Sequence, residues 1–123
     1  MYANSQPEKP AANVLDVPDF RNRLGGDEDL VRELLQLFLD DSEKNYAQVA
    51  AALSKGEAKA LRAAAHSLKG TAANISANAL RDVCRELEQQ AAAGDLTQAP
   101  ALLVPLRHVL DQTSKAIAAH LGQ

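Results

Sequence analysis

The residues with the clearest chemical potential surround His66, in the segment AHSLKGTAANI over residues 65–75. Apolar residues at helical spacing predict a helix here, with Leu61 on its core side. At 100° per residue His66 then faces solvent, and the cations Arg62 and Lys69 flank it. Nearby positive charge favours the neutral imidazole, which is the form with a lone pair for nucleophilic attack. The same cations would stabilise the anionic oxygens of a group transferred to the ring.

Small residues lie near His66 on the same side of the predicted helix, namely Ala63, Gly70 and Ala73. A glycine inside a helix costs about 1 kcal/mol relative to alanine, and at position 70 it would leave room for another protein to approach the ring. A plainer interpretation is also open at this point. A single surface histidine on a helix usually has no function, its neighbouring cations are solvated, and the glycine is a tolerated defect.

The sequence gives little support to other kinds of chemistry. His108 falls on the polar side of the last predicted helix and His120 near its end. No HExxH or paired-histidine spacing predicts a metal site. No GxxxxGK[ST] loop is present, so we expect no direct use of ATP and no bound cofactor. The single cysteine, Cys84, falls on an apolar helix face and is expected to be a small core residue.

Length and composition indicate one soluble, cytoplasmic domain. The chain has 123 residues, of which 46% are hydrophobic and 24% charged. A net charge of −3 gives no indication of nucleic-acid binding, and no apolar run approaches the ~20 residues of a membrane span. Residues 1–13 are polar, carry two prolines and lack a secretory signal pattern. We interpret them as a disordered arm or a cloning remnant, and residues 14–123 as the folded domain.

The elements that must position His66 are helices, because no segment alternates with the period of a strand. The predicted helices run over Val17–Leu24, Asp27–Leu53, Glu57–Ile75, Ala77–Ala93 and Pro100–Leu121. The fold class is therefore all-α. The architecture that this order favours is an up-down four-helix bundle with a short additional N-terminal helix.

Local signals mark where several of these helices begin and end. Asp16 and Asp27 are suited to cap the first two helices, and Ser76 is the expected cap of the fourth. Gly94 is a plausible stop for that fourth helix. Pro105 leaves two alternatives for the last helix, which either begins near Val104 or kinks at the proline.

The first long helix has more apolar positions than one face requires. Leu34, Leu37 and Phe38 are among its apolar positions, and Leu35 and Leu39 widen the apolar stripe beyond a single face. A stripe of this width indicates either deep burial or apolar surface left for a partner.

The segment over residues 65–75 resembles the signature of histidine-containing phosphotransfer (HPt) domains. That signature has a histidine, then Leu-Lys-Gly after one residue, then small residues. The downstream Leu80, Leu87-Glu88 and Gly94-Asp95 also fit, as does the upstream segment over residues 24–39. The resemblance covers roughly residues 16–121. The family often has glycine ten residues after the histidine, where this chain has Ser76.

The resemblance implies a four-helix bundle that relays a phosphoryl group between receiver domains of a hybrid histidine kinase or response regulators. His66 would be the acceptor, Lys69 would position or stabilise the phosphoryl group, and Gly70 would give access. The receiver would bring the aspartate and Mg²⁺, so the chain would need no metal or nucleotide site of its own. We expect a monomeric carrier without turnover on a small substrate. The residues expected to dock the receiver are Leu35, Phe38, Leu39, Arg62, Ala63 and Ala73.

Two rival functions remain open from the sequence. The broad apolar stripe on the first long helix would equally serve a helical module that binds receivers or other proteins without carrying phosphate. Such a module would make no use of His66. A small helical-bundle enzyme is the other alternative, but no paired carboxylates or nucleophile–base pair supports it.

Overall fold

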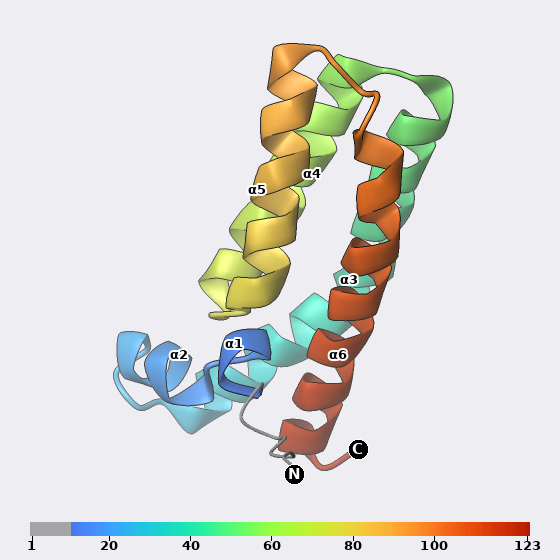
Figure 1. Ribbon diagram of the computed structural model, residues 1–123. Helices are drawn as coiled ribbons and strands as arrows, with labels where there is room; N and C mark the ends of the chain where they lie inside the picture. The colour runs from blue at the N-terminus through green and yellow to red at the C-terminus, as the bar shows by residue number, and fades with distance from the viewer. Residues whose placement is uncertain (1–10) are drawn as a thin grey trace, which may run out of the picture.

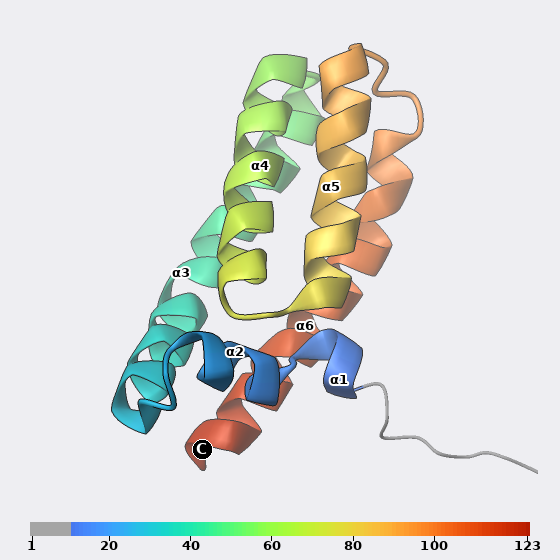
Figure 2. The same cartoon turned by 90° about the vertical axis from the view of Figure 1, so that its left-hand side faces the viewer.

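Helices make up most of the computed structural model, which describes residues 11–123, and no strand occurs over that range. The four longest helices form an up-down bundle, as predicted, and the short α1 and α2 cover one end of it (Figures 1 and 2). A 3₁₀ turn precedes the last helix. The helices are α1 (Ala11–Val14), α2 (Val17–Arg23), α3 (Glu28–Lys55), α4 (Ala58–Asn74), α5 (Asn78–Ala93) and α6 (Leu103–Leu121).

Several helix ends lie where the sequence signals place them. The carboxylate of Asp16 accepts a hydrogen bond from the backbone N–H of Asp19 at the start of α2. Asp27 accepts one from Leu30 at the start of α3. Gly94 ends α5 with a left-handed backbone, at a φ of 77°.

The last helix begins close to the first of the two positions predicted. It starts at Leu103, directly after the 3₁₀ turn Ala99–Leu102. Pro105 therefore stands in the first turn of α6, where a missing backbone N–H breaks no hydrogen bond within the helix.

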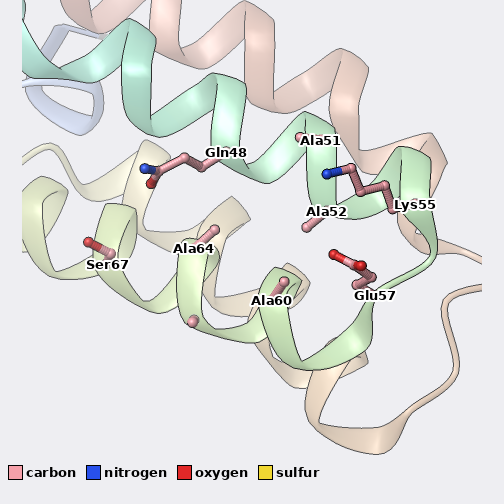
Figure 3. Close-up of a pocket in the computed structure, with 9 residues that line it drawn as sticks. Gln48, Ala51, Ala52, Lys55, Glu57, Ala60, Ala64 and Ser67 are labelled. Atoms are coloured by element: carbon pink, nitrogen blue, oxygen red, sulfur yellow. The ribbon is translucent and has the colours of Figure 1, made fainter.

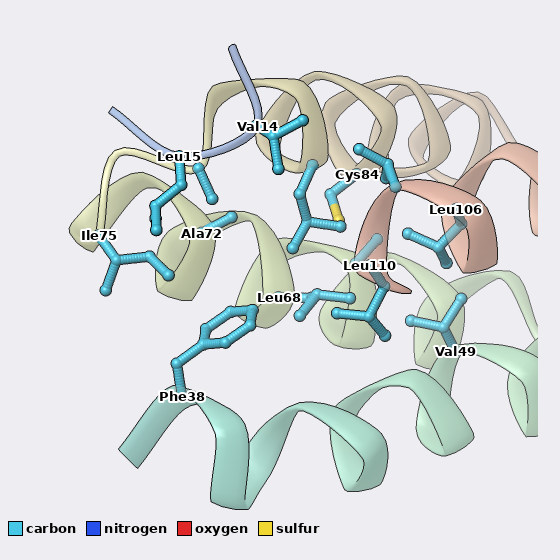
Figure 4. Close-up of a cluster of buried hydrophobic side chains, with 14 of the residues drawn as sticks. Val14, Leu15, Phe38, Val49, Leu68, Ala72, Ile75, Cys84, Leu106 and Leu110 are labelled. Atoms are coloured by element: carbon cyan, nitrogen blue, oxygen red, sulfur yellow. The ribbon is translucent and has the colours of Figure 1, made fainter. Parts of the chain in front are cut away.

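The folded part begins earlier than expected. Residues 1–10 of the predicted arm lie outside the described residues, but Ala11–Val14 form a helix. The apolar pair Val14 and Leu15 is buried and anchors this turn against the bundle (Figure 4). The predicted domain boundary at residue 14 therefore falls on the last residue of this helix.

The core fixes how α4 is rotated. Leu61, Ala65, Leu68 and Ala72 are completely buried along one face of this helix. They contact apolar side chains of the other helices, some of which are drawn in Figure 4. Because α4 packs mainly against α3 and α5, its remaining face is left to solvent.

Candidate functional site

His66 lies on the outer face of α4, as the helical phase predicts. Its side chain is 68% exposed. The neighbouring Ala65 and Leu68 are fully buried, so the histidine cannot turn inward without rotating the whole helix. The ring is consequently held at the surface, where another molecule can reach it.

A carboxylate from the next helix holds one nitrogen of this ring. Glu88 on α5 places Oε2 2.7 Å from Nδ1 of His66. Its other oxygen, Oε1, is 2.5 Å from Nζ of Lys69, one turn after the histidine on α4. Glu88 is mostly buried, with 17% of its side chain exposed. Glu88 thus joins the histidine and the lysine in one cluster across the α4–α5 contact.

This cluster determines which nitrogen of the neutral ring is available. Hydrogen bonding and the charge of the Lys69 ammonium, with a smaller contribution from His66, hold the pKa of Glu88 below its usual value. An ionised carboxylate can only accept hydrogen bonds, so Nδ1 of the neutral ring carries the proton. Nε2 then keeps its lone pair, which is the requirement for a nucleophile.

A shallow pocket of about 350 Å³ adjoins the ring, lined by Lys59, Arg62, Ala63, His66 and Glu88. Arg62 and Ala63 were expected near the site, and the structure brings both to it. Lys59 was not predicted. It occupies the same helix face two turns before the histidine, so helical periodicity alone could have identified it.

Gly70 is exposed, and a Cβ added there would meet no atom of residues 11–123 within 4 Å. Packing against the described residues therefore does not require a glycine at this position. Ala73 is only half-exposed and does not line the pocket beside His66. Its carbonyl accepts a hydrogen bond from Arg23 instead.

The expected docking residues on α3 are largely wrong. Leu35 is completely buried and Phe38 is 2% exposed, so neither presents an exposed side chain to a partner, although Phe38 forms part of the wall of a groove. Leu39 is half-buried against the core. The reason is the rotation of α3, whose core side includes Leu35 together with Val31 and Phe38 and leaves Leu37 outside it.

The large apolar residue of this helix that is exposed is Leu37, with a relative accessibility of 53%. It borders a groove of about 470 Å³ at the junction of α2, α3 and α4. The groove reaches Thr71 and Asn74, in the turn of α4 that follows Gly70. Its lining residues are Phe20, Arg23, Leu24, Leu34, Leu37, Phe38, Asp41, Thr71, Asn74 and Ile75.

A second groove, between the later half of α3 and the start of α4, has a different character (Figure 3). Alanines form most of it, with the polar Gln48 and Ser67 toward one end. Its charged residues, Lys55 and Glu57, lie together at the other end. The groove therefore offers small side chains and no nucleophile–base pair.

Two further properties concern the whole described range. Over residues 11–123, no helix is both long enough and apolar enough to cross a membrane. The same range holds no group of three or more His, Cys, Asp or Glu side chains arranged to bind a metal ion.

Sequence reasoning missed the role of Glu88. This residue was among those that carry the resemblance, but it follows His66 by 22 positions and lies on another helix. Only the pairing of α4 with α5 brings the two side chains together. The signal in the sequence was a carboxylate, Glu88, next to the apolar face of the helix predicted to follow that of His66.

Comparisons with known proteins identify the family of the chain. The Hpt domain family matches residues 33–116. The crystal structure of histidine-containing phosphotransfer protein B (HptB) from Pseudomonas aeruginosa PAO1 is 34% identical, with a TM-score of 0.81, and the match covers 87% of this chain and 93% of that one.

The HPT domain of a sensor hybrid histidine kinase from Shewanella shares the fold. Its TM-score is 0.80 at 17% identity, over 90% of this chain and 96% of that one. A comparison with curated protein sequences gave no match. The family match spans more than half of the sequence, and a solved structure above 30% identity covers nearly all of it. This chain therefore belongs to the family of histidine-containing phosphotransfer (Hpt) domains.

Proposed function

We propose that His66 accepts a phosphoryl group from the phosphoaspartate of a receiver domain and passes it to another receiver. The observation that carries this proposal is the pairing of Nδ1 with Glu88 at 2.7 Å. That pairing leaves Nε2 as the lone-pair nitrogen of an exposed ring, beside a pocket lined by Lys59 and Arg62. The chain is a phosphocarrier rather than an enzyme that turns over a substrate.

The transfer requires only one bond exchange. The N–P bond forms at Nε2 while the P–O bond of the acyl phosphate breaks, and the receiver's aspartate leaves as a carboxylate. The Nδ1 proton stays between the ring and Glu88, whose negative charge stabilises the positive charge that the ring gains. Catalysis of such a transfer consists mostly of positioning and charge stabilisation. We propose that any metal ion is contributed by the receiver.

Access to His66 supports a large donor rather than a small molecule. The open space around Gly70 lets a protein surface approach along the turn that follows the histidine. The apolar groove bordered by Leu37 begins on the adjacent side of α4. We place the receiver over these two features, so that its phosphoaspartate meets Nε2. All the residues named belong to one chain, so a monomer suffices.

The comparisons support the same function. The similar Pseudomonas protein is described as a histidine-containing phosphotransfer protein, and the Shewanella domain is part of a hybrid histidine kinase. A module that only binds receivers would need the groove but not the Glu88–His66 pair. No feature of the described residues favours that alternative.

The test is a transfer assay followed by intact mass. A panel of phosphorylated receiver domains is mixed with the wild-type chain, with His66→Gln, and with His108→Gln as a control for an exposed histidine on α6. We expect the wild type and His108→Gln to gain one phosphoryl group that is labile in acid and stable in base, and His66→Gln to gain none. Labelling of His66→Gln would contradict the acceptor assignment. Binding of a receiver without any labelling would favour the binding module.

A further inference from the structure

Lys59, like Arg62, is a cation at the site to which the mechanism above gives no step. It lies on α4 seven residues before His66, which is close to two full helical turns, and therefore on the same face. Arg62 lies between them, one turn before the histidine. Both cations line the pocket that adjoins the ring.

The direction of side chains on a helix brings this pocket to the reacting nitrogen. Side chains lean toward the N-terminus of their helix, so that each covers the turn before its own Cα. The ring of His66 consequently leans toward the turn of Arg62 and Ala63. Lys59 and Arg62 line the same pocket as the ring, so a group attached to Nε2 would share that pocket with both cations.

The charges around the pocket are not balanced. Lys69 forms a salt bridge with Glu88, the acidic residue that lines the pocket. Lys59 and Arg62 form no salt bridge with any carboxylate of residues 11–123. The pocket therefore presents two unpaired positive charges to whatever occupies it.

We propose that Lys59, together with Arg62, binds the oxygens of the phosphoryl group once that group is on Nε2 of His66. This inference rests on the proposed function and adds the residue that retains the group after transfer. No bond forms or breaks in this step, because the ammonium and guanidinium only donate hydrogen bonds to phosphoryl oxygens. Lys69 remains a positioning residue, since its charge is directed at Glu88.

Binding of the phosphoryl group by Lys59 and Arg62 has two measurable consequences. Cations that bind the phosphoryl dianion stabilise the phosphorylated chain and shift the transfer equilibrium toward His66. They also slow hydrolysis of the N–P bond if they bind the phosphoryl dianion of the ground state more strongly than the transition state for its loss to water. Hydrolysis is the sharper readout, since it proceeds without a receiver and cannot report on docking.

The experiment compares Lys59→Gln with Lys59→Arg and with Lys115→Gln. Lys115 is an exposed lysine of α6 without a salt bridge among the described residues, and so is a matched control. Each protein is labelled by a receiver, the receiver is removed, and the loss of the phosphoryl group is followed by intact mass. We expect Lys59→Gln to lose it about twofold to fivefold faster, as suits an exposed ion pair. Lys59→Arg and Lys115→Gln should behave as the wild type.

Each other outcome contradicts a particular claim. Equal loss rates for Lys59→Gln and the wild type would contradict phosphoryl retention while leaving His66 as the acceptor. Equal acceleration by Lys115→Gln would show a general charge effect and would also overturn the inference. Weaker receiver binding with an unchanged loss rate would make Lys59 a docking residue instead. A wild type that no receiver labels would contradict the proposed function itself.

Discussion

At the scale of single residues, Glu88 distinguishes His66 from an ordinary surface histidine. An unpaired imidazole on a helix would exchange between tautomers, and each nitrogen would be a nucleophile for only part of the time. The contact between Nδ1 and Glu88 selects one tautomer before the partner arrives. The salt bridge to Lys69 keeps Glu88 ionised and in place.

Two substitutions of Glu88 separate tautomer selection from charge. Glu88→Gln retains an oxygen that can accept a hydrogen bond from Nδ1–H, whereas Glu88→Ala removes that acceptor. We expect transfer to His66 to fall about tenfold or more in the alanine variant, since loss of orientation is costly in a positioned reaction. The glutamine variant should lose less. Nitrogen chemical shifts of His66 provide the second measurement. A predominance of the Nδ1–H tautomer in Glu88→Ala would contradict the role given to the carboxylate.

The same carboxylate predicts a pH dependence. The pKa of Glu88 is below its usual value of 4.5, chiefly because of the hydrogen bond with Lys69. A lowered carboxyl pKa means that folding is stabilised above the usual value and that this contribution is lost as the pH falls through the lowered one. The stability advantage of the wild type over Glu88→Gln should therefore persist above pH 4.5 and disappear in more acidic solution. Urea unfolding of both proteins across that range measures it, and an advantage that vanished near neutral pH would be inconsistent with the shift.

At the scale of elements, Gly70 lowers the helix stability of α4, and packing within the described part of the chain does not require a glycine there. Gly70→Ala should raise the free energy of unfolding by about 0.5–1 kcal/mol, because the new Cβ meets no neighbouring atom. Gly70→Gln should fold as well but slow transfer from a receiver, since its side chain would occupy the approach to His66. Thermal unfolding and transfer rates on the same samples give both quantities. A glutamine variant with the transfer rate of the wild type would remove the argument for access.

The turn between α4 and α5 is held by Ser76, and not as a helix cap, which corrects the role expected from its position. Ser76 has a φ of 59°. Its hydroxyl donates to Asp19 and accepts from Arg23, both at 2.7 Å. Arg23 also donates to the carbonyls of Ala73 and Asn74. These bonds fasten α2 to the end of α4, and the left-handed backbone explains why glycine would also fit here.

The two functions of Ser76 can be separated by substitution. Ser76→Ala keeps the strained backbone and loses the hydroxyl, so we expect a loss of about 1 kcal/mol in the free energy of unfolding. Ser76→Gly loses the same hydrogen bonds but relieves a left-handed conformation that costs a residue with a Cβ about 1 kcal/mol. The glycine variant should thus be close to the wild type in urea unfolding. Equal stability of the two variants would refute the strain argument.

At the scale of the whole molecule, the sequence was sufficient for the bundle, the outward direction of His66 and the clearance at Gly70. Each of these follows from helical periodicity within one segment. The Glu88 contact and the burial of Leu35 could not be derived in that way. Both depend on how α3, α4 and α5 are rotated against one another, and a stripe as wide as that of α3 allows more than one rotation.

The corrected rotation of α3 makes the docking surface testable. Leu37 and Val104 are the two large apolar residues most exposed over the described range. Leu37 borders the groove beside α4, whereas Val104 lies near Tyr46 and Arg107 in a pocket of α3 and α6. Neither side chain contributes to the core, so an aspartate at either position should leave the fold intact.

We expect the receiver to cover the groove while it reaches Nε2 of His66. Leu37→Asp should then weaken receiver binding about tenfold, because one apolar side chain is no longer buried at the interface. Val104→Asp carries the same change in charge and hydrophobicity on another helix pair, and should bind as the wild type does. Titration of a receiver against the three proteins measures the difference, with transfer to His66 as a second readout. Equal weakening by both variants would indicate a general effect of negative charge, and weakening by Val104→Asp alone would move the docking surface to α6.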